Sequence, residues 1–262
     1  MRAALALSAV MVMAVFFARN VSAEPAWEEI KGDHFIVYHV GKDEFAKEVV
    51  REAERFYQRI ADELGYERYS NFWQWENRVK IRIYPDRESF QSSLASPGWS
   101  EGLANYDTKE IISYAWHEGF IENLLAHEIA HLIFRDFVGF KGEVPLWLDE
   151  GVAQWMESTK RQILRENAKA LLKQGELIPL RTLTSTDIRD KGKEDMVKVF
   201  YIQAAMVVGF LIEEHGSENF IELCRNLRDG KLLDEALKFA YPTTIRDLED
   251  LEQRFRKYVE AG

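Results

Sequence analysis

The chain has 262 residues, of which 47% are hydrophobic, and a formal net charge of −10 at pH 7. That length and hydrophobic content are enough for a substantial core, and they exclude a disordered chain. The acidic balance disfavours nucleic acids and other polyanions as partners. Because Cys224 is the only cysteine, an intramolecular disulfide is excluded and the packed core must supply the stability.

Residues 1–23 have the features of an export signal peptide. Arg2 precedes an apolar run that ends at Ala18, and small residues then lead up to Ala23. Because the run is shorter than the roughly 20 apolar residues of a membrane-spanning helix, we expect cleavage near Ala23 rather than a retained anchor. The mature protein would then be periplasmic or extracellular, with no stable membrane span.

A mixed α/β pattern follows the signal. Apolar residues recur at helical spacing from Glu44 to Leu64, and Gly65 ends the pattern. Alternating or β-branched runs predict strands over residues 35–40, 79–84 and 111–116. Residues 96–102 are rich in serine, glycine and proline, which predicts a loop before the last of these strands.

Beyond Gly119 the pattern becomes almost wholly helical. Helical spacing predicts helices over residues 120–137, 146–159, 161–173, 195–214 and 219–228, with two more before the C-terminus. We therefore expect an α+β protein, with a mixed α/β lobe and a small sheet over residues 24–138 and a mainly helical lobe over residues 139–262. No long linker or internal repeat separates the two parts, so they should form one unit.

The segment His127-Glu128-Ile129-Ala130-His131 carries the clearest chemical signal. It lies in an apolar run of helical period, and residues four apart project from the same side of a helix, so both imidazoles can reach one cation. Imidazole is a common zinc ligand, and Glu128 would lie beside the metal, where it could accept a proton from water. Two ordinary structural histidines are the alternative, although a chance match has odds of about one in a hundred.

Glu150 is the candidate for a third metal ligand, because catalytic zinc usually has three protein ligands and one open position. The histidine-bearing helix is expected to end at Gly139, and Pro145 suits the first turn of the next helix. A connection this short makes the two helices antiparallel, so Glu150 can face His131. The sequence therefore predicts one zinc ion held by His127, His131 and Glu150.

Both predicted helices resemble the two signature helices of the gluzincin metallopeptidases. The resemblance is carried by residues 124–131 and 145–155, and by the 18 residues between His131 and Glu150. Within that group the chain is similar to the peptidase MA-like proteins, relatives of thermolysin and the neutral aminopeptidases. The resemblance implies a zincin-like α/β lobe followed by a helical lobe, an active-site cleft between them, and a peptide or protein substrate.

The resemblance also implies roles for residues outside the metal site. Tyr201 opens a helix similar to the one whose tyrosine donates a hydrogen bond to the oxyanion, although a packed ring with a solvated hydroxyl is the alternative. A stretch similar to the edge strand that lies beside the metal and pairs with substrate comprises Gly102, Leu103, Ala104 and Asn105, followed by Tyr106. Aminopeptidases have a glutamate there that binds the substrate's free amine, and its absence here favours an endopeptidase.

Two neighbours of Glu150 are candidates for bracing the metal ligands. Asp149 stands where the family commonly has asparagine, and Gln154 lies one turn beyond Glu150. A hydrogen bond from Gln154 to a ligand and a solvated surface amide are both compatible with the sequence.

Together these features predict zinc-dependent hydrolysis of peptide bonds, with Glu128 as general base and Tyr201 at the oxyanion. Two alternatives stay open: a non-catalytic peptide-binding or envelope-assembly module on the same fold, and a zinc hydrolase of a non-peptide acyl substrate. The sequence makes no prediction of the oligomeric state.

Overall fold

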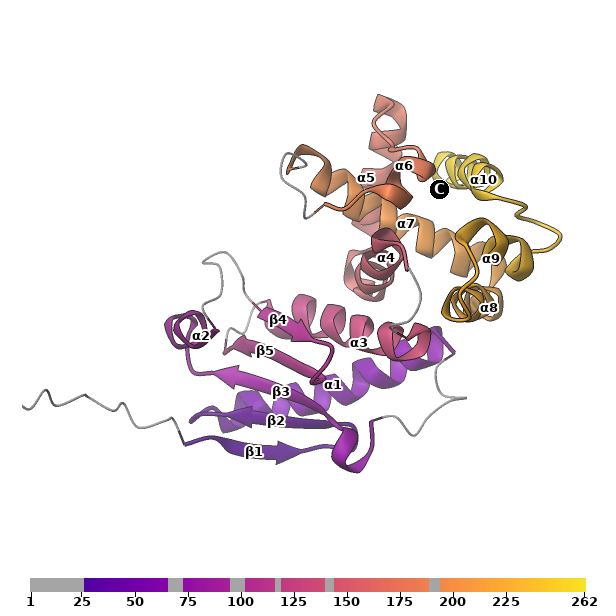
Figure 1. The fold of residues 1–262 in the computed structure, drawn as a ribbon. Coiled ribbons are helices and arrows are strands. Elements are labelled where there is room, and N and C mark those ends of the chain that lie inside the picture. The colour runs from indigo at the N-terminus through magenta and orange to yellow at the C-terminus, as the bar shows by residue number, and fades with distance from the viewer. Residues whose placement is uncertain (1–25, 66–72, 95–101, 116–118, 140–143, 189–193) are drawn as a thin grey trace, which may run out of the picture.

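A computed structural model describes residues 26–65, 73–94, 102–115, 119–139, 144–188 and 194–262 (Figure 1). The predicted signal over residues 1–23 lies outside these ranges, as does the predicted loop over residues 96–101. None of the described helices has the length and hydropathy that crossing a membrane requires.

The first half of the chain is built around a five-stranded sheet. Its strands are β1 (Glu28–Lys31), β2 (Phe35–His39), β3 (Val79–Tyr84), β4 (Gly102–Asn105) and β5 (Glu110–Tyr114). They lie in the order β1-β2-β3-β5-β4, with β2, β3 and β5 parallel and with β1 and β4 antiparallel at the two edges. The three parallel strands are the three that the sequence predicted. Gly102 belongs to β4 rather than to a loop.

Helices cover both faces of this sheet (Figure 1). They are α1 (Asp43–Glu63), α2 (Arg87–Leu94) and α3 (Ala126–Val138). Successive side chains of β2 and β3 point to opposite faces of the sheet. Residues such as Phe35 and Ile81 therefore point into one core, to which α1 and α3 also contribute. On the other face, α2 packs Phe90 against Tyr84 and Tyr114. α3 is thereby held against the sheet along one side and is left with its other side facing the second half.

The second half is helical, which confirms the predicted α+β class. Its helices are α4 (Leu146–Met156), α5 (Arg161–Gln174), α6 (Leu180–Ser185), α7 (Val197–His215), α8 (Ser217–Arg228), α9 (Leu233–Ala240) and α10 (Leu248–Ala261). Short turns of other helix types are η2 (Trp75–Asn77), η3 (Phe120–Leu125), η4 (Ser158–Lys160) and η5 (Glu194–Met196). α7 contacts α4, α5, α8 and α10 and forms the centre of this half. The boundary at residue 138 stays a prediction.

Two glycines allow α4 and α7 to pack closely. A Cβ on Gly151 would lie 2.5 Å from the backbone oxygen of Ala204, and a Cβ on Gly209 would lie 2.5 Å from the ring of Trp155. Real side chains do not tolerate such separations, so only glycine fits at both contacts. This packing fixes the position of α4, which carries Glu150.

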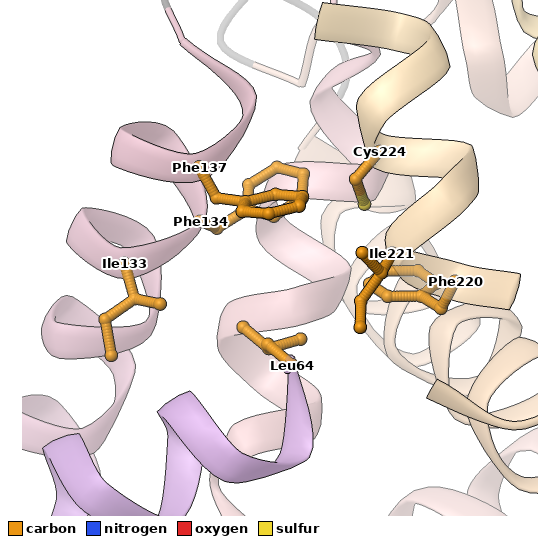
Figure 2. Close-up of a pocket in the computed structure, with 7 residues that line it drawn as sticks. All are labelled: Leu64, Ile133, Phe134, Phe137, Phe220, Ile221 and Cys224. Carbon is orange, nitrogen blue, oxygen red and sulfur yellow. The ribbon is translucent and has the colours of Figure 1, made fainter. Parts of the chain in front are cut away.

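A small apolar pocket lies where the two halves meet (Figure 2). Its lining comes from the end of α1, from α3 and from α8, and consists of Leu64, Ile133, Phe134, Phe137, Phe220, Ile221 and Cys224. Its volume of about 10 Å³ is at the lower limit for one water molecule, and its lining offers that water no good hydrogen-bond partner. Cys224 is buried, and burial raises the pKa of its thiol well above the usual range, so it is a packing residue.

Candidate metal centre

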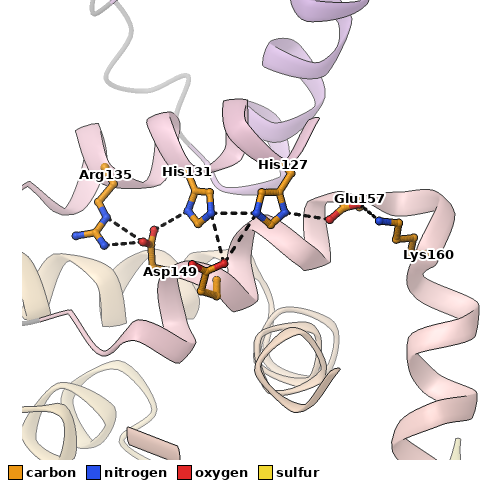
Figure 3. Close-up of polar contacts among 7 residues, drawn as sticks. His127, His131, Arg135, Asp149, Glu157 and Lys160 are labelled. Carbon is orange, nitrogen blue, oxygen red and sulfur yellow. Dashed lines mark hydrogen bonds and ion pairs between the residues drawn. The ribbon is translucent and has the colours of Figure 1, made fainter. Parts of the chain in front are cut away.

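The two histidines project from the start of α3. The helix is preceded by η3, a π-helical turn, and His127 and His131 follow in its first two turns. Ile129 and Ile133 are fully buried in the core with the sheet. Because these apolar residues set the rotation of α3, the histidines face α4 across the junction of the two halves (Figure 3).

Glu150 of α4 meets these histidines. Its Oε2 lies 3.9 Å from Nε2 of His127 and 3.6 Å from Nε2 of His131, and the two Nε2 atoms are 3.1 Å apart. A point equidistant from three atoms with these separations lies about 2.1 Å from each, which matches the distances of zinc to histidine and carboxylate ligands. The three predicted ligands therefore lie close enough together to share one ion.

The hydrogen bonds of the imidazoles support the same assignment (Figure 3). His127 donates its Nδ1–H to Glu157, and His131 donates its Nδ1–H to Asp149, both at 3.0 Å. Carboxylates can only accept these bonds, so in the neutral rings each Nε2 is left with its lone pair directed toward Glu150. Three such electron-rich atoms repel one another unless a cation lies between them. The donor set, two imidazoles and one carboxylate, is typical of zinc.

The surroundings of His131 favour positive charge. In the absence of a bound cation, burial opposes protonation of this ring, yet the neighbouring carboxylates of Asp149 and Glu150 raise its pKa to about 10. Asp149 is only 2% exposed, and Arg135 donates two hydrogen bonds to its second oxygen. The site therefore attracts a cation from solvent.

Glu128 lies beside the ligands and is nearly buried, with 9% of its surface exposed. Burial is the largest influence and raises the pKa of the Glu128 carboxyl above its usual value, although the two histidines act in the opposite direction. A carboxylate with a raised pKa next to a metal site is well suited to accept and release a proton.

A model of the Peptidase MA superfamily matches residues 71–261. The chain belongs to the Peptidase MA superfamily. The matched region includes β4, α3, α4 and α7, so the candidate metal centre described above lies inside it. No curated protein matches the chain. Membership of the superfamily makes this protein a metallopeptidase-like enzyme.

The structure also places the other residues for which the sequence predicts a role. The stretch Gly102–Asn105 forms β4, an edge strand of the sheet. Tyr201 lies in the second turn of α7 and is half-buried against Phe200. Gln154 is half-buried, and its backbone oxygen accepts the N–H of Glu157. The roles of Tyr201 and Gln154 stay predictions.

Three residues near the candidate centre of this Peptidase MA protein make contacts that were not predicted from the sequence. Glu157 braces His127, and its other oxygen pairs with Lys160. Arg135 braces Asp149. Tyr106, directly after β4, packs its ring edge-on to His131 at a centroid distance of 6.1 Å. Burial, together with three nearby carboxylates, raises the pKa of its hydroxyl well above the usual range, so Tyr106 is a neutral hydrogen-bond donor.

A second group of potential ligands comprises Glu28, His39 and Asp43. Both of its carboxylates are exposed, and the backbone N–H of Lys42 donates to Nδ1 of His39 at 3.4 Å. That nitrogen, which lies 3.8 Å from Asp43, is therefore already engaged by a donor. The group at His127 has the better geometry and the braced imidazoles, which make it the stronger candidate for a metal centre.

Proposed function

We propose that this protein is a zinc-dependent peptidase of the gluzincin type, in which His127, His131 and Glu150 hold the ion. The observation that carries the proposal is the convergence of three ligand atoms with both imidazoles held by carboxylates on their far side. Bound zinc would polarise the scissile carbonyl and lower the pKa of water.

In this proposal Glu128 is the general base. Its carboxylate accepts a proton from the attacking water and then delivers it to the leaving amine. The direction of its pKa shift supports the role, because a raised pKa makes the carboxylate a stronger acceptor for the proton of the water.

We assign binding of the substrate backbone to β4. An extended peptide can add to the edge strand of a sheet, and β4 is an edge strand that leads directly to Tyr106 beside His131. A Cβ on Gly102 would lie 2.3 Å from the side chain of Leu124, so β4 lies against the turn that leads into α3. The four residues of β4 include no acid that could hold a free amine, which supports cleavage of internal bonds.

Digestion of a peptide library by the mature protein tests this function. Half of the library carries acetylated N-termini, and each half is digested with and without a chelator. We expect internal cleavage of both halves, abolished by the chelator. Removal of single residues from free N-termini alone would identify an aminopeptidase instead. Zinc-loaded protein that cleaves no peptide but hydrolyses esters would indicate the non-peptide hydrolase, and inactivity on both would indicate the binding module.

Replacing the proposed base tests the mechanism separately. Glu128→Gln should lower kcat by about 10²–10⁴-fold while the zinc content stays at that of the wild type, because the substitution removes the proton acceptor and no ligand. Glu122→Gln, an exposed change in the turn just before α3, is the matched control and should leave kcat unchanged. Full activity of the Glu128 variant would refute the assignment.

We also propose that the protein is exported and that its signal is removed after Ala23. The proposal rests on the apolar run and small residues near the start of the chain. N-terminal sequencing of protein from the periplasm or the medium should begin at Glu24. Membrane-bound protein that keeps its first residues would show a retained anchor instead.

A further inference from the structure

Arg135, Asp149 and His131 form a continuous row of hydrogen bonds that ends at the metal centre (Figure 3). Nε and Nη2 of Arg135 donate to Oδ2 of Asp149 at 3.1 and 2.5 Å. The other oxygen, Oδ1, accepts the Nδ1–H of His131 at 3.0 Å. Each oxygen of this buried carboxylate thus has its own partner, one on each side.

The hydrogen bonds of this row balance the charge of Asp149 and also fix the orientation of its carboxylate. A carboxylate held by His131 alone could rotate about its own axis, because a single hydrogen bond restrains only one oxygen. The fork of Arg135 restrains the second oxygen from the same face of α3, one helical turn beyond His131. Because Asp149 then presents Oδ1 in one place, the imidazole of His131 is held with Nε2 toward Glu150.

We propose that Arg135 is a positioning residue for the metal centre: by holding Asp149 it fixes the orientation of His131, and so sets how tightly the site binds zinc. The inference rests on the proposed zinc function and extends it to a residue that touches neither the ion nor the substrate.

The corresponding row at the other histidine is held differently. Lys160 pairs with Glu157, but it comes from the turn that directly follows α4, and 39% of its side chain is exposed. A lysine offers a point charge on a flexible stem, whereas the guanidinium of Arg135 is a planar fork and only 24% exposed. The positioning effect is therefore assigned to Arg135, and removal of Lys160 should weaken zinc binding less.

The test measures zinc affinity by competition with a chromophoric chelator at fixed pH, with no substrate present. Arg135→Met should bind zinc about 10–100-fold more weakly than the wild type, the usual effect of losing such an outer hydrogen-bond partner. Arg82→Met is the matched control, because Arg82 also pairs with a carboxylate, Glu110, and is similarly exposed, but it has no histidine in its row. This control should keep the wild-type affinity.

A rescue pair tests the row itself. Asp149→Asn should weaken zinc binding to a similar degree, because the new amide nitrogen meets the donors of Arg135. Adding Arg135→Gln should restore most of the zinc affinity. The side-chain oxygen of glutamine lies as many bonds from Cα as Nε of arginine does, so it can accept a hydrogen bond from the amide nitrogen that Asp149→Asn introduces. A purely structural role for Arg135 would not produce this recovery.

The outcomes decide between the two proposals. Arg135→Met with wild-type affinity, or a double variant no tighter than Asp149→Asn, would overturn the positioning role alone. If Arg135→Met does not fold, zinc affinities of Asp149→Asn and of the double variant, which has no buried charge in the row, still distinguish the two outcomes. Wild-type protein that binds zinc but cleaves no peptide would overturn the proposed function and leave this inference standing.

Discussion

Two tyrosines compete for the role of oxyanion donor. Tyr201 is implied by resemblance, whereas Tyr106 lies beside His131 and has a neutral hydroxyl. If Tyr201 donates to the oxyanion, Tyr201→Phe should lower kcat by roughly 10²–10³-fold with little change in KM. Tyr106→Phe, which keeps the ring and removes only the hydroxyl, should then leave kcat unchanged. Steady-state kinetics with the reverse pattern would transfer the role to Tyr106.

The carboxylate of Asp250, far from the proposed metal centre, should make the stability of the fold depend in part on pH. Asp247 accepts the N–H of Asp250 at the start of α10, and Asp250 in turn accepts the N–H of Arg246. Burial would raise the pKa of Asp250, but the hydrogen bonds that its carboxylate accepts from Arg246 and Arg254 lower it below the usual value. Its stabilising effect is therefore full above the unfolded-state pKa of about 4 and is lost as the pH falls through the folded-state value.

Asp250→Asn tests that direction. The variant should be less stable than the wild type at pH 7, by roughly 1 kcal/mol in the free energy of unfolding. The difference should shrink as the pH falls below about 4, because the wild-type carboxyl is then protonated as well. Thermal melts of both proteins between pH 7 and pH 3 measure it. A difference that stays constant over this range would contradict the assignment.

At the level of single residues, the sequence predicted those contacts that follow from a fixed spacing along the chain. His127 and His131 are four residues apart on one helix, and Glu150 follows after one short connection, so their convergence could be inferred. The contacts of Glu157 and Arg135 could not be inferred, because their partners lie 30 and 14 residues away and no spacing rule links them. The helix predicted to continue to residue 159 ends at Met156, and the next residue, Glu157, turns its carboxylate to His127.

The contact between α4 and α7 gives a prediction at the scale of an element. Gly151→Ala would place a methyl group 2.5 Å from the backbone oxygen of Ala204, so the two helices must separate. We expect the free energy of unfolding to fall by about 1–3 kcal/mol, and zinc affinity to fall as well because Glu150 is the adjacent residue. Denaturation and chelator competition measure the two effects. Unchanged zinc affinity would show that α4 is not held by this contact.

Elements with strong periodicity were predicted, and short ones were not. The three parallel strands alternate or are β-branched, and the long helices repeat apolar residues at helical spacing. β1 has mostly polar residues, and among the side chains of α2 whose burial is described only Phe90 is buried, so neither has a clear period. β4 has no alternation of its own and was expected as an edge strand only through the resemblance. Tertiary contacts, rather than a local sequence pattern, determine the structure of β1, α2 and β4.

At the scale of the whole molecule, the proposed metal centre joins the two halves. Two ligands come from α3, which packs on the sheet, and the third comes from α4, which packs on α7. Zinc at about 100 times its dissociation constant should therefore raise the free energy of unfolding by about 2.7 kcal/mol, or the Tm by roughly 5–10 °C. Calorimetry with and without a chelator measures this. His131→Ala should show no shift, and an equal shift in that variant would place the zinc elsewhere.

The zinc content of purified protein is the sharpest test of the proposed site, in which His127, His131 and Glu150 together hold one ion. Elemental analysis after gentle preparation should give about one zinc per wild-type chain and much less for Glu150→Ala, because a three-ligand site holds its metal tightly. Wild-type protein with less than about 0.2 zinc per chain, or a Glu150 variant that keeps a full equivalent, would contradict this assignment of the ligands.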